Sequence, residues 1–354
     1  MKSVKHVKWP GFFLILFAAF PLRMAQAAEP ALKTVKEIAL YQGHDRDRRV
    51  LAAARQEDTL TLYTSMNAED LKKLVGAFEK KYGIKVNAWR ASSEKLLQRV
   101  IAENNAGKQT WDVVESNGPE LESMVREKLA QKFYSPHKKD LIQEAIPKHE
   151  EYLPTRLNVF VQAYNKNKVK PDEVPKTYKD LLDPRWKGRL GIEVEDVDWM
   201  AGLIKAMGET EGTDYFKKLS GQNLSKRKGH ALLAQMVVSG EVPFALTVYG
   251  YKIEQFKQEG APVEWLALQP AIARPNGVVL YKNAPHPNAA LLFADFLLSD
   301  AQKLLLELSH VPASTKVETK LNKFKMYVID PAVIIDEWDK WSRLWNEIII
   351  KAEK

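Results

Sequence analysis

Hydrophobic and polar residues alternate from position 59 to position 63, and this pattern predicts a β-strand. The next segment carries apolar residues at the spacing of one helix face, at Leu71, Leu74, Val75, Phe78 and Tyr82. Asn67 is suited to cap this predicted helix, and Gly83 is suited to end it. Because only one face of the helix is apolar, we expect that face to cover a sheet.

The pattern then repeats, with a second strand at 84–89, a helix that runs out at 104–107 and a third strand at 112–114. In a right-handed βαβ arrangement the strand ends meet at one edge of a parallel sheet, where open α/β sheets bind ligands. The polar residues after the strands are therefore candidates to contact a small polar solute. They are Thr64, Ser65, Asn67, Ser92, Ser93, Ser116 and Asn117. The alternative is that they only cap helices.

The second half of the chain predicts another α/β unit. One long strand is expected at 157–165, followed by strands at 189–194, 241–247 and 277–281. Helices are expected at 119–130, 212–219, 230–238 and 288–298. A final helix carries Ile334, Trp338, Trp341, Trp345 and Ile348 on one stripe, and we expect this stripe to belong to the core.

The first 27 residues have the three regions of a secretory signal peptide: a basic start, an apolar run at 12–20 and the sequence Ala25-Gln26-Ala27. The apolar run is too short to be a permanent membrane anchor. We therefore expect cleavage after Ala27, export to the periplasm and no stable insertion in the membrane.

Composition narrows the function further. The formal net charge of +8 includes four basic residues and no acids within the predicted leader, so about half of it belongs to that leader. The remaining charges are interspersed, which argues against a nucleic-acid partner. The chain has no cysteine, so it has neither disulfides nor thiolate chemistry. Its length of 354 residues is typical of about two domains.

Motifs of common enzymes are absent from the sequence. It contains no Gly-x-Ser-x-Gly elbow, no His-Glu-x-x-His and no glycine-rich phosphate loop. The seven histidines are scattered, and no two have metal-ligand spacing. We therefore expect neither catalysis nor a cofactor, although a periplasmic enzyme stays as an alternative from another class.

Several segments, in their order, resemble the periplasmic solute-binding proteins of ABC importers, extracellular solute-binding family 1, and most of all its ferric-iron-binding branch. They are the residues LTLYTS at 60–65, FEKKYGIKV at 78–86, DPRWKG at 183–188, GEVP at 240–243 and PNAA at 287–290. Together these segments span nearly all of the chain after the leader.

The resemblance implies an α/β fold of the type II periplasmic binding proteins, with two α/β lobes joined by hinge crossings and a ligand cleft between them. The implied parts are a signal peptide at 1–27, first lobe at 28–157, second lobe at 158–270, a return to the first lobe at 271–325, and a C-terminal helix at 326–354. It also implies a monomer that delivers a small-molecule or metal ligand to an ABC permease in the inner membrane. A ligand-sensing partner of a membrane receptor is an open alternative.

The resemblance also locates the iron site of the relatives, which use a His, a Glu and two adjacent Tyr. The matching positions here are Asn67, Asn117, Gly250 and Tyr251, with Tyr249 one place outside the pair. Neutral amides replace anionic ligands poorly around a hard trivalent metal, so we do not expect the usual iron chemistry. A rebuilt iron site stays open, with Tyr249, Tyr251 and Asp196 as candidate ligands.

The loop that holds a synergistic anion in the relatives aligns with 196–198, beside Glu193 and Glu195. Carboxylates at a helix start repel an anion, even though the helix dipole favours one. We therefore predict a cationic or metal-containing cargo held by Asp196 and Asp198. Aromatic faces for cation–π contacts are expected from Trp199, Tyr249, Tyr251 and Trp89. The alternative is that the acids cap the helix and face solvent.

Overall fold

The structure is a computed structural model that describes residues 1, 3, 4, 6, 34–108, 110–319 and 324–351. The predicted signal peptide at 1–27 lies almost entirely outside these residues and stays a prediction. Every element described below lies within the unit Lys33–Lys354. Across the described segments, every helix is too short or too polar to cross a membrane.

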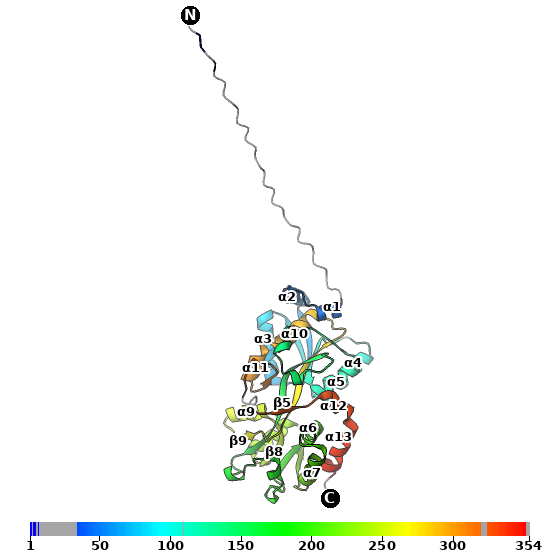
Figure 1. The fold of residues 1–354 in the computed structure, drawn as a ribbon, viewed down its shortest axis with the longest axis vertical. Helices are drawn as coiled ribbons and strands as arrows, with labels where there is room; N and C mark the ends of the chain where they lie inside the picture. The colour runs from blue at the N-terminus through cyan, green and yellow to red at the C-terminus, as the bar shows by residue number, and fades with distance from the viewer. Residues whose placement is uncertain (2, 5, 7–33, 109, 320–323, 352–354) are drawn as a thin grey trace. The chain divides into compact units, whose positions relative to one another are not determined.

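The first helices and strands follow the predicted order. Helices α1 (Val35–Leu40) and α2 (Arg46–Glu57) precede strand β1 (Thr59–Thr64), helix α3 (Ala68–Tyr82) and strand β2 (Lys85–Arg90) (Figure 1). Asn67 caps α3 by accepting a hydrogen bond from the Asp70 backbone N–H, and Gly83 ends the helix with a φ of 74°. Both predicted helix boundaries are thus confirmed.

The next elements are α4 (Ser93–Asn105), β3 (Val113–Asn117) and α5 (Gly118–Arg126). β1 pairs in parallel with both β2 and β3, so the ends of these three strands meet at one sheet edge as predicted. β3 is longer than the predicted 112–114 because its last residues pair with a later strand, with Asn117 opposite Asn276. The partner strand is more than 150 residues away in the sequence, so the residues that lengthen β3 show no local alternation of apolar and polar residues that would have predicted it.

Two long antiparallel strands, β5 (Tyr152–Asn165) and β10 (Ala271–Tyr281), connect the two halves of a 12-stranded sheet. The strand order is β2-β1-β3-β10-β5-β8-β6-β7. Both strands begin five or six residues before the predicted starts at 157 and 277. The first residues of each strand include a proline, Pro154 in β5 and Pro275 in β10, and a proline in the sequence predicts an interruption of a strand. The pairing is irregular between Asn276 and Gly277, where the register opposite Pro154 shifts.

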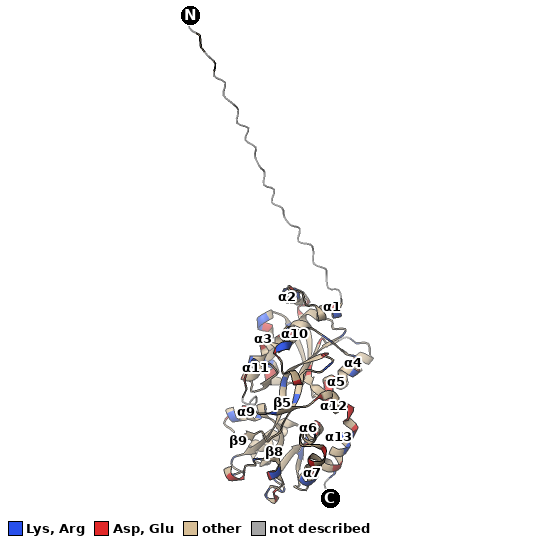
Figure 2. Ribbon diagram, viewed as in Figure 1, with Lys and Arg blue, Asp and Glu red and all other residues tan. Residues whose placement is uncertain are grey.

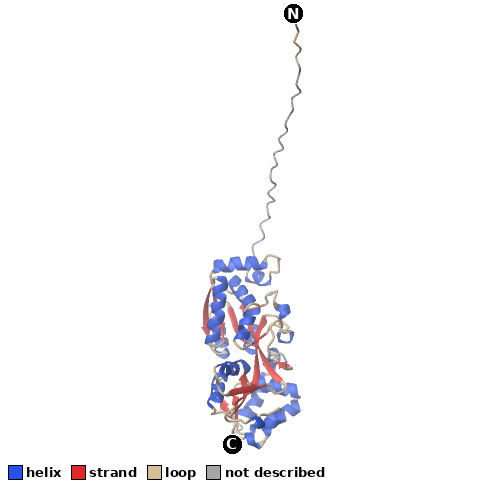
Figure 3. Cartoon of the chain, turned by 90° about the vertical axis from the view of Figure 1, so that its left-hand side faces the viewer, coloured by secondary structure: helices blue, strands red, loops and turns tan. Residues whose placement is uncertain are grey.

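The second half of the sheet is built from β6 (Leu190–Glu193), β7 (Ser225–Arg227), β8 (Phe244–Tyr249) and β9 (Val263–Leu266). Its helices are α6 (Val197–Met207), α7 (Glu209–Ser220), α8 (His230–Ser239) and α9 (Gly250–Gln258). β6 pairs in parallel with β7 and β8, and β8 pairs antiparallel with β5. The second predicted α/β unit is therefore confirmed, with helices surrounding the strands in Figure 3.

Helices α10 (Pro287–Leu298) and α11 (Ala301–Glu307) return to the first half, as expected. Phe293 and Phe296 of α10 pack on Phe78 of α3 with ring centroids 4.9 and 5.4 Å apart. The lobe limits at 157, 270 and 325 stay predictions. The remaining short strands are β4 (Ala130–Gln131), β11 (Val311–Pro312) and β12 (Met326–Val328). Single turns of 3-10 helix are Lys138–Asp140, Gln143–Ala145, Pro171–Glu173, Tyr178–Leu182 and Pro184–Trp186.

The C-terminal helix is divided into three pieces rather than the single predicted helix. They are α12 (Pro331–Asp336), α13 (Trp338–Trp345) and a π-helical turn, η7 (Asn346–Ile350). Trp341 and Trp345 are buried as expected, whereas Trp338 is 43% exposed and does not belong to the core. The break falls at Glu337, whose backbone leaves helical geometry with a φ of −103° and a ψ of 14°.

Lys and Arg residues are interspersed among Asp and Glu residues along the ribbon of both halves (Figure 2). The absence of a nucleic-acid partner stays a prediction.

Candidate functional site

Hydroxyl and amide side chains form a connected network at the edge where β1, β2 and β3 end. Ser116 Oγ lies 3.0 Å from Ser93 Oγ and 3.3 Å from Ser65 Oγ. Asn117 Nδ2 donates a hydrogen bond to Ser93 Oγ over 2.8 Å. Asn117 opens α5 but makes no side-chain cap, so its amide serves the network instead. The structure therefore brings together four of the seven predicted polar candidates of the first lobe, called the polar network below.

The other three first-lobe candidates have different surroundings. The buried Thr64 hydroxyl donates to Glu115 Oε2 over 2.7 Å, so it stabilises an internal carboxylate. Asn67 caps α3 through its Oδ1. Ser92 precedes α4 without a side-chain cap and is exposed. The alternative that these polar residues only cap helices is therefore correct for Asn67. Thr64 instead binds the buried Glu115 carboxylate.

The crossing strands add polar residues that the sequence analysis did not select. Asn158 on β5 and Asn276 on β10 both donate from Nδ2 to Asn117 Oδ1, over 3.4 and 3.1 Å. Arg274 is opposite Asn158 in the strand pairing, and side chains two residues apart share a face, so Arg274 and Asn276 lie on the same face of β10. That face therefore links the polar network to the second lobe. Arg274 lies before the predicted strand at 277–281 and next to Pro275, so no signal in the sequence pointed to it.

Arg274, on the crossing strand β10, is the centre of a buried charged cluster that includes the acidic loop at 196–198. Its Nη2 donates to the Tyr249 hydroxyl oxygen over 2.6 Å and lies 3.3 Å from Asp196 Oδ1. Its Nε lies 3.1 Å from Asp198 Oδ2. The guanidinium also covers the Phe160 ring, 4.9 Å from the centroid. Arg274, Asp196 and Asp198 are all buried, so the predicted acidic loop faces an internal cation and not solvent.

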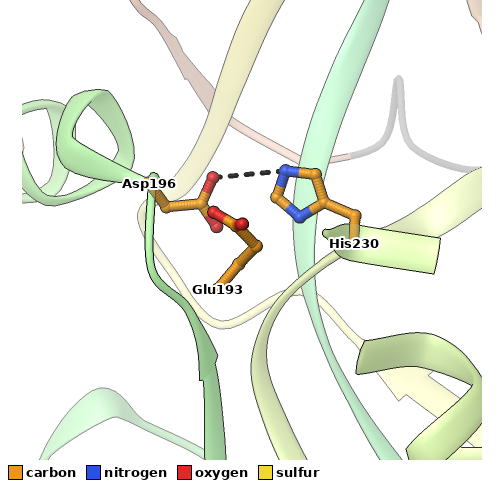
Figure 4. A group of neighbouring side chains, drawn as sticks. All are labelled: Glu193, Asp196 and His230. Atoms are coloured by element: carbon orange, nitrogen blue, oxygen red, sulfur yellow. Dashed lines mark ion pairs between the residues drawn. The ribbon is translucent and has the colours of Figure 1, made fainter. Parts of the chain in front are cut away.

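A carboxylate and a histidine adjoin this cluster. Glu193 ends β6, Asp196 precedes α6 and His230 begins α8, and one ligand atom of each lies within 4.8 Å of the others (Figure 4). His230 Nε2 lies 3.2 Å from Asp196 Oδ1. Glu193 accepts hydrogen bonds from the backbone N–H groups of Gly229 and Glu195, over 2.8 and 2.6 Å. These three residues could hold a metal ion, and His230 was missed because its partners are far away in sequence.

Burial sets the protonation of the acids around Arg274. It raises the pKa of Asp198, although the Arg274 charge opposes the shift. It also raises the pKa of Glu193, with a further increase from Asp196. Glu120, in the first turn of α5, has its pKa raised by burial to about 7, again against the effect of Arg274. The cluster therefore combines an excess of carboxyl groups over cations with a strong tendency to bind protons.

The two candidate tyrosines lie together but face different groups. Their rings stack with centroids 6.0 Å apart. Tyr249 contacts Arg274, and burial raises its pKa well above the usual value. Tyr251 packs on His310 with centroids 4.1 Å apart, and burial also raises its pKa, although Arg156 and a hydrogen bond with Asn67 lower it. Both phenols are thus favoured in the protonated form.

Two of the four aromatic rings that were expected to make cation–π contacts with the cargo, Trp199 and Trp89, are already packed against other residues of the protein. Trp199 is fully buried in the core, where it packs on Phe216 at 5.3 Å, so the expectation that it faces a ligand is wrong. It is drawn inward because α6 is buried along most of its length. The Arg99 guanidinium lies 4.2 Å from the Trp89 centroid, so the protein's own Arg99 covers that ring.

Comparison with solved structures identifies the fold class of this chain. The iron-bound HitA of Pseudomonas aeruginosa superimposes with a TM-score of 0.72 at 22% identity, over 82% of this chain and 99% of that one. AfuA of Actinobacillus pleuropneumoniae, with exogenous fructose-6-phosphate bound, gives a TM-score of 0.70 at 22% identity, over 83% and 99%. The fold is thus the two-lobe α/β fold of the periplasmic binding proteins, as predicted.

The family follows from the sequence. The model of the bacterial extracellular solute-binding proteins matches residues 65–304, and this chain belongs to that family. It is the substrate-binding component of an ABC transporter, as predicted. Iron uptake protein A1 of Synechocystis is 26% identical over 313 residues, which are 79% of this chain and 82% of that protein. Because structural neighbours of equal similarity carry iron or a sugar phosphate, the fold alone does not define the cargo.

Proposed function

We propose that this protein captures a small cationic or metal-containing solute between the polar network and the Arg274 cluster, and delivers it to an ABC permease in the inner membrane. The polar network would orient the cargo through hydroxyl and amide groups. The second-lobe carboxylates, chiefly Asp196 and Asp198, would hold its positive charge. Tyr249 and Tyr251 would contribute the cation–π contacts with the cargo, without the two tryptophans that the sequence also predicted for this role.

One observation carries the charge assignment. Asp196 Oδ2 is a buried acceptor atom without a hydrogen-bond partner among the described residues. A buried acceptor without a donor is costly, and native proteins place such atoms where a ligand or water completes them. The other oxygen of this carboxylate, Oδ1, already contacts Arg274 and His230, so Oδ2 is the atom left for a cargo. A cation with hydrogen-bond donors is the cargo that satisfies it best.

Ferric iron is the second candidate, because relatives are described as an iron uptake protein and as an Fe(3+)-binding periplasmic protein. The proximity of Tyr249, Tyr251 and Asp196 favours it. The neutral amides Asn67 and Asn117, at the positions where the iron-binding relatives use a His and a Glu, oppose it, because amides replace anionic ligands of a hard trivalent metal poorly. We therefore place a cationic solute first.

We further propose that the mature protein is a periplasmic monomer without catalytic activity, exported by cleavage after Ala27. The family membership supports a role in binding. A receptor partner, in place of a permease, would make the same protein a sensor. Copurification of the tagged protein with a permease and its ATPase would support import, whereas copurification with a receptor alone would support sensing.

The test of the cargo class is native mass spectrometry of the mature protein purified gently from its own periplasm, with elemental analysis of the same sample. We expect a bound cationic mass, with or without a metal. Asp198→Asn should weaken its binding about tenfold or more, because in the proposed site it removes one of the two carboxylates that hold the charge of the cargo. The exposed Asp172→Asn is the matched control and should leave the affinity unchanged. An anionic cargo, or an affinity unaffected by Asp198→Asn in a folded variant, would refute the proposal.

A further inference from the structure

We propose that Glu193, Asp196 and His230 form a binding site for one divalent transition-metal ion of the zinc or manganese type. This inference rests on the proposed function, because it names a chemical class for the cationic cargo. The site differs from the positions that the resemblance assigns to iron, which are Asn67, Asn117 and the tyrosine segment. It uses a histidine from α8 that the sequence analysis set aside.

The geometry is close to that of a bound ion. One ligand atom of each residue lies within 4.8 Å of the other two, and Figure 4 shows the three side chains pointing toward a common centre. Metal–ligand distances of about 2.0–2.2 Å place ligand atoms roughly 3–3.5 Å apart, so small side-chain rotations complete the site. Each residue stands at the end of a strand or helix or directly beside one, which fixes the backbone positions.

A second, independent observation points to a ligand at this place. Asp196 is 1% exposed, yet its Oδ2 has no hydrogen-bond partner among the described residues. The Nδ1 atom of His230 is also buried and also lacks a hydrogen-bond partner among the described residues. Buried polar atoms are rarely left in this state, and a metal ion satisfies an acceptor oxygen and an imidazole nitrogen together.

The supporting contacts suit a metal site. Backbone N–H groups of Gly229 and Glu195 hold the Glu193 carboxylate, and Arg274 holds Asp196 through Oδ1. Such outer contacts orient metal ligands and commonly contribute to affinity. Three protein ligands also leave a coordination position for water or a chelating molecule, as in open zinc sites.

The ligand types narrow the choice of metal to divalent transition ions, because the site offers two carboxylates and one imidazole. The imidazole ligand favours zinc or ferrous iron over magnesium and calcium, which prefer oxygen ligands alone, and the two carboxylates also suit manganese.

The test uses the mature protein after chelator treatment, titrated with ZnCl2 or MnCl2 at pH 7.5 and followed by calorimetry and elemental analysis. We expect one ion per chain. His230→Gln should weaken binding at least about 100-fold, since losing a ligand exceeds the 10–100-fold effect of outer contacts. Glu193→Gln should weaken it as well, and the exposed His44→Gln is the matched control. Circular dichroism and thermal unfolding establish that each variant is folded.

The outcomes separate this inference from the proposed function. If neither ion binds, or if both folded variants bind as well as wild type, the metal site is refuted. An organic cation whose binding depends on Asp198 would then leave the proposed function intact. If ferric iron binds, with a phenolate absorption band that Tyr249→Phe removes and His230→Gln leaves in place, the rebuilt iron site replaces this one.

Discussion

The Nη2 atom of Arg274 donates a hydrogen bond to the hydroxyl oxygen of Tyr249 across 2.6 Å. The two residues are 25 positions apart in sequence and belong to β10 and β8, which are separated by β5 in the sheet. This contact brings a permanent cation from a crossing strand into the acidic loop of the second lobe. The acids therefore have an internal partner before any cargo arrives, and only their excess charge is available for binding.

Removal of Arg274 should destabilise the protein strongly. Arg274→Gln leaves Asp196 and Asp198 buried without their counter-charge, and breaking a buried ion pair in this way costs about 3–5 kcal/mol. Urea unfolding at pH 7.5 measures the loss. Arg185→Gln is the control, because Arg185 forms a solvent-exposed pair with Asp183 that contributes little to stability. Equal stability of the two variants would show that Arg274 does not balance the cluster.

The raised pKa of Glu120 should make stability depend on pH. Between the ordinary carboxyl pKa and about 7, the unfolded chain has lost the proton that the folded protein retains, so wild-type stability falls as pH rises through this window. Glu120→Gln should remove that fall, while the exposed Glu127→Gln should not. Cation affinity should rise with pH around 7 in wild type and change less in Glu120→Gln. Identical pH profiles of all three proteins would contradict the assignment.

A buried histidine should produce a second pH effect of the opposite sign. His310 Nε2 lies 2.8 Å from Asp70 Oδ2. Burial lowers the pKa of His310, with Arg156 acting in the same direction and Asp70 and Glu115 opposing it. The neutral form is therefore favoured in the fold, so this contribution to stability is present above pH 6.5 and is lost as pH falls.

His310→Gln should cost about 1–3 kcal/mol at pH 7.5, because the Asp70 carboxylate loses a buried partner. Its stability should decline less than that of wild type between pH 6.5 and 5. Chemical unfolding at a series of pH values measures both effects, with the exposed His44→Gln as control. A wild-type decline that persists unchanged in His310→Gln would assign the acid sensitivity to other groups.

Two tryptophans of the C-terminal segment should differ sharply in importance. Trp345 is 2% exposed, and its Nε1 donates to the Val194 carbonyl oxygen over 2.8 Å, beside the Glu193 and Asp196 loop. Trp345→Ala should cost about 3–5 kcal/mol by creating a cavity. Trp338→Ala, at a position 43% exposed, should cost roughly 0.5 kcal/mol or less. Denaturant unfolding compares them, and similar losses would show that the stripe is buried as one unit.

The local pattern of the sequence determined most of the secondary structure. Alternation placed β1 and β2, and helical spacing with Asn67 and Gly83 placed α3 with its boundaries, because capping and amphipathicity act within a few residues. The order of motifs was enough to identify the two-lobe fold and the family. The extra length of β3, β5 and β10 was not predictable, since those residues are strands only through partners distant in the chain.

For the site, the sequence by itself selected the serines and Asn117, because polar residues at strand ends have a predictable location in α/β sheets. The resemblance to the family selected the acidic loop and the two tyrosines. Only the tertiary structure decided what those residues contact. Arg274 and His230 enter the cluster from β10 and α8, and Trp199 turns into the core. Electrostatic interactions depend on distance in space and on burial, and neither quantity is encoded in local spacing.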